Sequence, residues 1–195
     1  PFAETPTLPS FDAALSLSGA AAAGPHTLWL SEVDGKQRFG PRTAVSFTLT
    51  PLPVVESALA FSLYWDRPSD LDLHVVLPDG TEVYKDERNS WEPSVNDAPN
   101  AFESGGRLDL DSNGQCRVDG RNNENVIWSV EPPAGLYTVR VDTFSLCAET
   151  SARYQVEARY HGERVGLTEG QVLPTATRGA HGAGAGVTVL ELRVR

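Results

Sequence analysis

Short segments in which apolar and polar residues alternate, separated by clusters of Gly, Pro, Asn and Asp, constrain the fold of this chain most strongly. Side chains of a β-strand point alternately to its two faces, so alternation indicates a strand with one face in a core. Strands at this spacing are typical of antiparallel sandwiches. The sequence therefore predicts an all-β fold, an antiparallel β-sandwich that is Ig-like or jelly-roll-like. The expected strands include residues 26–33, 43–50, 58–65, 81–85, 107–111, 125–130, 136–142, 152–160, 163–168 and 187–194.

A domain boundary is predicted in residues 50–57, TPLPVVES, where two prolines interrupt the strand pattern. Residues 51–195 form the predicted sandwich. Residues 1–50 are expected to be a strand-rich segment packed on it, a remnant of an Ig-like or fibronectin-like module. The few strands predicted in this segment cannot bury two sheet faces. The segment therefore either packs on the larger domain or is completed by another chain through strand addition. Within it, residues 11–23 are ambiguous between helix and strand.

The distribution of charge limits the classes of partner. The formal net charge is −10, and residues 66–131 hold 15 of the 26 acidic residues but only 6 of the 16 basic ones. A nucleic-acid partner is not expected, because a phosphate backbone requires a basic patch. Membrane insertion is not expected either, because no apolar run is long enough to span a bilayer. The acidic excess suits a cation ligand, or serves solubility alone.

Cysteine and methionine usage indicates an exported protein. The chain contains no Met and two cysteines, whose spacing matches no metal motif. Cys116 and Cys147 lie near the ends of segments that can be neighbouring strands, which favours a disulfide over two buried free thiols. Closing a loop of about 30 residues would stabilise the fold by roughly 3–4 kcal/mol. We expect an extracellular or periplasmic protein whose signal peptide has been removed.

The segment SDLDLHVVLPDG, residues 69–80, is a predicted strand with an unusual polar face. Its leucines and valine form an apolar face, and the opposite face carries Asp70, Asp72 and His74. Two like charges repel each other, so a cation between the carboxylates would explain the arrangement. The alternative is a strand face that is simply solvated.

A second segment, residues 105–128, again presents oxygen ligands beside an apolar strand face. Calcium takes 6–8 oxygen ligands at about 2.3–2.6 Å, and two D-x-D pairs with an Asn/Glu loop can supply them if the strand ends meet. An EF-hand is not expected, because Gly120 stands where that motif needs Glu. His74 is a further candidate ligand that would favour zinc, although a lone strand histidine is more often hydrogen-bonded. The predicted calcium ligands are Asp70, Asp72, Asp109, Asp111, Asn113 and Glu124.

Four stretches, LYWDRPSDLDLHVVLPDG, GGRLDLDSN, ENVIW and PPAGLYTVRVD, together resemble the YfaP-like family of bacterial exported domains of unknown function. The resemblance covers about residues 58–160 and implies a β-sandwich accessory module at the cell surface or in the periplasm, without an established reaction. The strand pattern is also similar to that of calcium-binding domains appended to secreted bacterial proteases and collagenases. The insert at residues 86–104 and the cysteines lie outside the match. The motif residues carried over by position are Asp70, Asp72, Asp109, Asp111 and Glu124.

The remaining motifs carry little chemistry. The chain has no nucleophile elbow, zinc-protease or P-loop motif. No glycosidase pair stands out, and a carboxylate on a surface strand would not have the raised pKa that a buried pocket gives, so we do not expect an enzyme. The Gly-rich residues 179–188 are predicted to form a mobile hairpin loop. Trp91 is a candidate partner contact, unless it covers a sheet edge.

The sequence thus predicts a non-catalytic, extracellular calcium-binding module for adhesion or for binding a protein or glycan partner. The alternative is a structural subunit of a cell-surface assembly or filament that self-associates by strand addition. A second alternative is an accessory domain of a secreted hydrolase.

Overall fold

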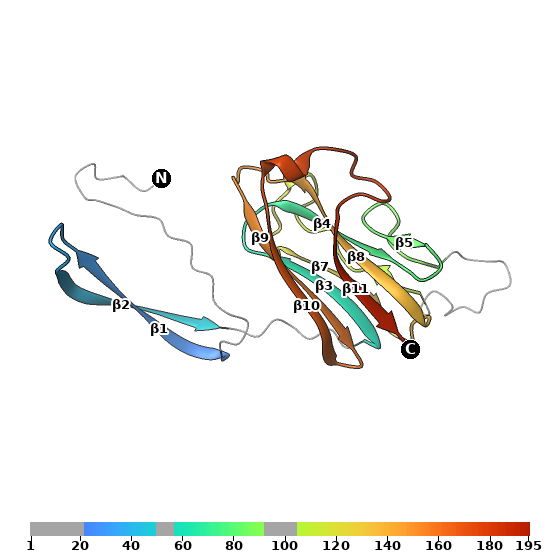
Figure 1. Cartoon of the computed structure of the whole chain (residues 1–195), viewed down its shortest axis with the longest axis horizontal. Helices are drawn as coiled ribbons and strands as arrows, with labels where there is room; N and C mark the ends of the chain where they lie inside the picture. The colour runs from blue at the N-terminus through green and yellow to red at the C-terminus, as the bar shows by residue number, and fades with distance from the viewer. Residues whose placement is uncertain (1–21, 50–56, 92–104) are drawn as a thin grey trace. The chain divides into compact units, whose positions relative to one another are not determined.

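The computed structural model of the chain describes residues 22–49, 57–91 and 105–195 (Figure 1). The chain divides into two compact units, Pro1–Pro53 and Val54–Arg195. Nearly all of the segment for which helix and strand were both expected, residues 11–23, lies outside the described residues, as does most of the 86–104 insert.

The smaller unit contains a two-stranded antiparallel sheet, β1 (Gly24–Val33) and β2 (Phe39–Leu49). The turn between them is organised by Asp34, whose Oδ1 accepts hydrogen bonds from the backbone N–H groups of Lys36 and Arg38. An ion pair with Arg38 accompanies these bonds. The large apolar side chains of Trp29 and Phe39 are exposed.

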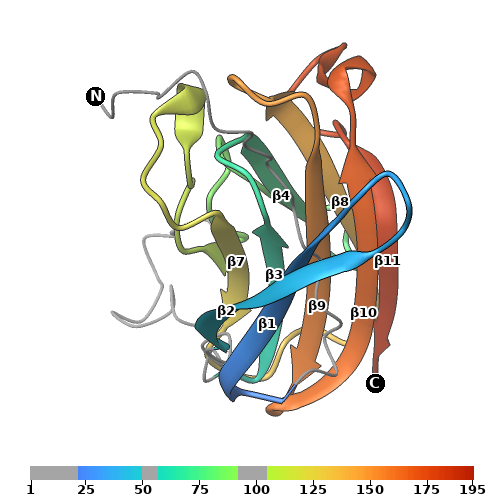
Figure 2. The ribbon, with the colours of Figure 1, turned by 90° about the vertical axis from the view of Figure 1, so that its left-hand side faces the viewer.

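The larger unit is a sandwich of two antiparallel sheets that lie face to face (Figures 1 and 2). The predicted all-β sandwich is confirmed. The five-stranded sheet has the order β10 (Glu163–Val172), β9 (Ala152–Tyr160), β3 (Leu59–Trp65), β7 (Asn123–Trp128) and β6 (Arg107–Leu108). The four-stranded sheet has the order β11 (Val187–Val194), β8 (Gly135–Ser145), β4 (Asp70–Val76) and β5 (Glu82–Val83).

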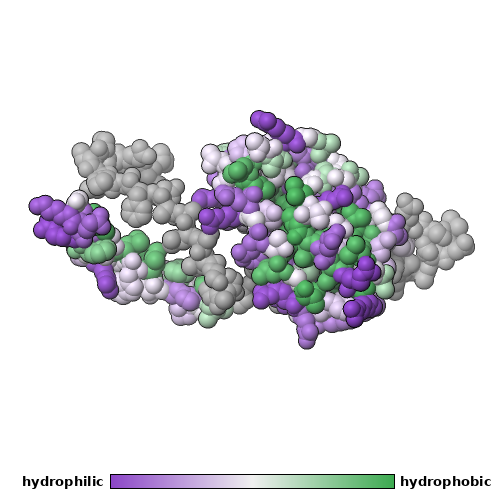
Figure 3. Space-filling view, in the orientation of Figure 1, coloured by the Kyte–Doolittle hydropathy of each residue, from purple (hydrophilic) through white to green (hydrophobic). Residues whose placement is uncertain are grey.

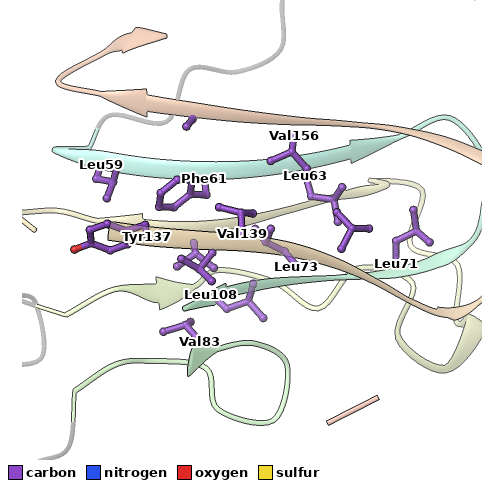
Figure 4. Packing of buried hydrophobic residues seen from close by; sticks show 14 of the residues in the cluster. Leu59, Phe61, Leu63, Leu71, Leu73, Val83, Leu108, Tyr137, Val139 and Val156 are labelled. Atoms are coloured by element: carbon purple, nitrogen blue, oxygen red, sulfur yellow. The ribbon is translucent and has the colours of Figure 1, made fainter. Parts of the chain in front are cut away.

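The core lies between the sheets, where the apolar faces of the alternating strands meet (Figure 4). It contains an aromatic group in which Trp128 packs edge-on against Phe61 and Tyr137, with ring centroids 6.1 and 5.4 Å apart. The Tyr137 hydroxyl donates a hydrogen bond to the Pro133 carbonyl, which satisfies its one polar atom. Gly106 lies against the Trp128 ring, where an added Cβ would come within 2.2 Å of it.

Two departures from the predicted strands position the site. The strand expected over residues 107–111 ends at Leu108, so the following residues leave the sheet. The predicted hairpin at residues 179–188 is wrong, because β10 and β11 are edge strands of different sheets. The connection between them crosses from one sheet to the other, and it includes a short 3₁₀ helix, η3 (Pro174–Thr177).

The surface is mixed in character. On the face shown in Figure 3, hydrophobic and polar residues are interspersed over the sandwich. Val165, Leu167 and Val187, on the edge strands β10 and β11, are exposed. Among the described residues, no helix has the length and apolar character needed to cross a bilayer.

Candidate metal centre

Strand β4 is buried on both faces. Leu71 and Leu73 enter the core and are fully buried. On the opposite face, Asp70 and Asp72 have exposed fractions of 1% and 0%, and His74 is also fully buried. The alternative of a solvated strand face is therefore excluded. Burying carboxylates is costly unless a cation or hydrogen-bond donors offset the loss of hydration, so this face requires such partners.

Three aspartates come together at the end of β4. Asp70, Asp72 and Asp111, here called the aspartate cluster, each place one carboxylate oxygen within 4.8 Å of the others. Asp111 reaches the cluster because the chain leaves the sheet after Leu108. Within the described residues, one buried oxygen of each of these carboxylates, Oδ1, has no hydrogen-bond partner. The cluster thus offers three oxygen ligands that the described protein groups do not satisfy.

Asp70 is held by a short 3₁₀ helix, η2 (Gly114–Cys116). The backbone N–H groups of Gln115 and Cys116 donate hydrogen bonds to the Asp70 carboxylate. Cys116 is itself bonded to Cys147, just beyond β8, with the Cα atoms 5.6 Å apart, so the predicted disulfide is confirmed. The disulfide ties η2 to the sandwich and so fixes the donors that orient Asp70.

Gly114 makes room for the third carboxylate. A Cβ atom at this position would lie 2.8 Å from Oδ1 of Asp111 and 3.0 Å from its Oδ2, so the carboxylate would have to shift. Glycine therefore allows η2 to pack directly against the cluster.

Burial and mutual repulsion raise the pKa values of these carboxyl groups. Loss of hydration, with the neighbouring Asp72 charge, raises the pKa of Asp70 from 3.8 to about 6. The pKa of Asp72 is also raised by burial, an effect that Lys85 opposes. Our expectation that this strand face could not raise a carboxyl pKa rested on solvent exposure, and that premise is wrong.

Lys85 provides the ion pair that reaches the cluster. Its Nζ lies 2.6 Å from Oδ2 of Asp72 and 3.9 Å from the centroid of the Phe144 ring. A cation over an aromatic face is attracted to the ring quadrupole, so Phe144 provides a second contact for the ammonium group. A single ammonium group faces three carboxylates, which leaves negative charge at the cluster.

Glu124, a predicted ligand, is not a member of the aspartate cluster. Its side chain is fully buried, and Oε2 accepts the backbone N–H of Leu73 at 2.8 Å while Oε1 accepts that of Ser112 at 3.1 Å. It therefore cross-links β4 to the loop that carries Asp111. Burial and the nearby Asp72 charge raise its pKa well above the ordinary value.

Two further predicted ligands hold loops in place. Asp109 accepts hydrogen bonds from Asn125 at both carboxylate oxygens, from the backbone N–H and from the side-chain amide. Asn113 donates to the carbonyl of Ser69 and to Oδ1 of Asn122, and its own Oδ1 accepts the backbone N–H of Asp119. These residues support the loops around the cluster and lie outside the group of three.

His74, the candidate that would have favoured zinc, is not part of the aspartate cluster. Its Nδ1 lies 2.9 Å from Oε1 of Glu82, and its ring stacks on Tyr84. Glu82 is also bound through Oε2 by the backbone N–H of Gly184. Together with the contact of 2.7 Å between His181 Nδ1 and Asp142 Oδ2, this bond anchors the β10–β11 connection over the outer face of the four-stranded sheet.

A cavity of about 320 Å³ opens beside the aspartate cluster. Asp72 is not among the residues that line it, so the cluster faces the cavity through its other two members. An ion held there would have room on one side for water or for an added ligand. The lining residues are Asp70, Lys85, Asp86, Asp111, Gly114, Gln115, Phe144, His181 and Gly182.

Sequence reasoning missed several of these residues. Lys85, Phe144 and His181 come from three distant parts of the chain, and no local pattern connects them. One signal was present, because Lys85 is one of only two lysines among the 16 basic residues of the chain. Trp91, the predicted partner contact, is half-buried at the start of the insert, and its backbone N–H donates to the side chain of Asn89.

Comparison with models of known protein families, with curated proteins and with solved structures finds no match to this chain. The chemistry of the site must therefore be read from its own residues. Three carboxylates, each with a buried and unpaired oxygen, lie next to a cavity of about 320 Å³ and form a group that could hold a metal ion.

Proposed function

We propose that this chain is a non-catalytic, exported β-sandwich module that binds a divalent cation, and that the cation is calcium. The observation that carries the proposal is the set of buried Oδ1 atoms of Asp70, Asp72 and Asp111, which have no partner among the described residues. A cation would replace the lost hydration of these oxygens and offset the repulsion between the carboxylates. In the bound form it would fix the loops around the cavity as a surface for a protein or glycan partner.

The donor set favours calcium over zinc. Hard cations take oxygen ligands, whereas structural zinc is bound mainly by imidazole and thiolate. The three clustered side chains offer only oxygen, His74 is paired with Glu82, and both cysteines are in a disulfide. Water molecules in the adjacent cavity would complete the 6–8 ligands of calcium.

Thermal melts with calcium, magnesium, zinc or a chelator test the proposal. A ligand that binds only the folded state at 100 times its Kd adds about 2.7 kcal/mol of stability, a shift on the order of 5–10 °C for a domain of this size. We expect this shift with calcium. Asp111→Asn, which removes a cluster charge at constant size, abolishes it.

Asp109→Asn is the matched control. It changes a second aspartate two residues away, whose oxygens accept hydrogen bonds from Asn125 and lie outside the cluster. We expect this variant to melt at a lower temperature and to keep the calcium shift. A wild-type melt that is indifferent to every ion, or equal loss of the shift in both variants, contradicts the assignment of the site.

The disulfide is compatible with an oxidising compartment, which supports the proposed extracellular or periplasmic location. Membership of the YfaP-like family stays part of the proposal and rests on the sequence stretches given above. Trp91, half-buried within the insert, is the proposed partner contact.

The β1–β2 sheet favours a second candidate, a subunit of a surface assembly joined by strand addition. A two-stranded sheet is marginally stable alone in water, and this one exposes Trp29 and Phe39. A strand from another copy would add backbone hydrogen bonds and cover these side chains.

A further inference from the structure

Lys85 occupies a position that the proposed ion would need. Its Nζ is 2.6 Å from Oδ2 of Asp72, and its side chain is only 14% exposed because the ammonium group sits against the Phe144 ring. The chain has fourteen arginines and two lysines, so a lysine at this point departs from its general usage. An ammonium group is a compact point charge, unlike the wide, forked guanidinium group.

Charge at this position is unbalanced. The aspartate cluster has three carboxylates, and Asp142 adds negative potential at Asp72. The ammonium group of Lys85 supplies one positive charge. His181 lines the same cavity, and its Nδ1 contacts Oδ2 of Asp142.

We propose that Lys85 is a tethered counter-cation that competes with the divalent ion for Asp72. Ion binding is then an exchange, in which the ammonium group leaves Asp72 and the Phe144 ring as the ion enters. This inference rests on the proposed function. It adds Lys85 as a residue that sets the affinity of the cluster for the divalent ion and that moves when the ion binds.

Electrostatic repulsion opposes simultaneous binding of the two cations to Asp72. A divalent ion bound to Oδ1 of Asp72 at about 2.3–2.6 Å would lie roughly 4–5 Å from an ammonium group on Oδ2 of the same carboxylate. Repulsion at this separation is strong where water is largely excluded. Lys85 lines the cavity, so its flexible side chain has an open space into which it can move.

The exchange has two consequences. Lys85 lowers the affinity of the cluster for the ion, because displacement of the ammonium group opposes binding. It also stabilises the ion-free fold, because its ammonium group is a counter-ion in direct contact with the buried Asp72 carboxylate. When the ion binds, the displaced ammonium group of Lys85 moves to the rim of the cavity, where it could contact a partner.

The first experiment measures calcium affinity by calorimetry in Lys85→Met, which removes the ammonium group and keeps an unbranched apolar side chain that reaches as far as Cε. We expect the affinity to rise by tenfold or more, on the order of the interaction between two close charges in a partly buried site. Lys85→Arg, which keeps the charge, is the matched control and should bind no more tightly than the wild type. Equal or weaker calcium binding by Lys85→Met overturns the inference.

The second experiment uses the unmodified protein, so it does not depend on the folding of a variant. Amine-reactive labelling followed by peptide mass spectrometry reports on Lys85 and on Lys36, the only other lysine, which is exposed in the β1–β2 turn and serves as the internal reference. Calcium should increase the labelling of Lys85 relative to Lys36 several-fold, because the ammonium group leaves Asp72. An unchanged ratio under conditions where calcium shifts the melt overturns the exchange.

Failure of the inference and failure of the proposed function give different results. Calcium binding with unchanged labelling, and with equal affinity in Lys85→Met, leaves the metal site and removes the exchange. No calcium binding by either protein contradicts both proposals. If Lys85→Met binds calcium and the wild type does not, the competition is supported, and Lys85 then keeps calcium out of the wild-type site.

Discussion

At the residue scale, the same residue type has opposite roles two positions apart. Asp109 has both carboxylate oxygens bonded to Asn125, whereas Asp111 leaves a buried oxygen unpaired. Glu124 is buried more deeply than either and bonds to two backbone N–H groups. A ligand candidate is therefore distinguished by whether its oxygens already have donors, because a satisfied oxygen gains little from a cation.

The raised pKa of Asp70 predicts an unusual dependence of stability on pH in the presence of a chelator. The folded-state pKa of about 6 lies above the ordinary 3.8, so the folded protein binds more protons than the unfolded chain between these values. Stability therefore falls as the pH rises through this window. We expect the chelated protein to melt a few degrees higher near pH 5 than at pH 7, in thermal melts followed by circular dichroism.

Asp70→Asn supplies the control for this prediction. The amide carries no charge at either pH, so this variant should lose much of the difference between the two melts. The raised pKa of Glu124 acts in the same direction, so part of the difference between the two melts should remain in this variant. A wild-type protein that melts lower at pH 5 than at pH 7 would contradict the assigned direction.

At the scale of elements, the site depends on how three short pieces meet β4. The loop after β6 brings Asp111, η2 brings the donors for Asp70, and the segment after β5 brings Lys85. The disulfide from η2 to the end of β8 limits the movement of one of these pieces. The cluster is thus a property of loop placement around a rigid strand.

Gly114→Ala tests the placement of η2. An added Cβ at 2.8 Å from Oδ1 of Asp111 must displace that carboxylate, so we expect weaker calcium binding, by about tenfold, in calorimetric titrations. Gly182→Ala is matched, since Gly182 lines the same cavity and a Cβ there meets nothing within 4 Å. It should bind calcium as the wild type does. Unchanged binding in Gly114→Ala would show that Asp111 is not held as a ligand.

At the scale of the whole molecule, the two units have very different means of stabilisation. The sandwich has a continuous core with many fully buried side chains. The β1–β2 sheet has none of its described side chains fully buried, so it depends on groups beyond its own two strands. The cation site belongs to the sandwich, and the candidate for assembly belongs to the hairpin.

A shortened chain of residues 57–195 separates these properties. We expect it to fold, to keep the calcium-dependent melt and to elute as a monomer in size-exclusion chromatography with light scattering. The full chain should elute as a dimer or larger species at about 100 μM if strand addition operates. A monomeric full chain would contradict the assembly candidate and leave the cation site unaffected.

The sequence by itself determined the sandwich, most of its strands and the disulfide. Alternation is a local signal with a period of two, and the chain shows it almost without interruption from β7 to β10. The six ligands predicted from the sequence included Asp70, Asp72 and Asp111, because an apolar face beside repeated carboxylates is visible in a few consecutive residues.

Only the tertiary structure decided which carboxylates remain without donors. Asp109, Asn113 and Glu124 find partners across 16, 44 and 51 residues of sequence, in Asn125, Ser69 and Leu73. The burial of the polar face of β4, and the placement of Lys85 on Asp72, likewise depend on segments that are remote in the chain. Hydrogen-bond satisfaction and desolvation are properties of the assembled environment, so no local pattern carries them.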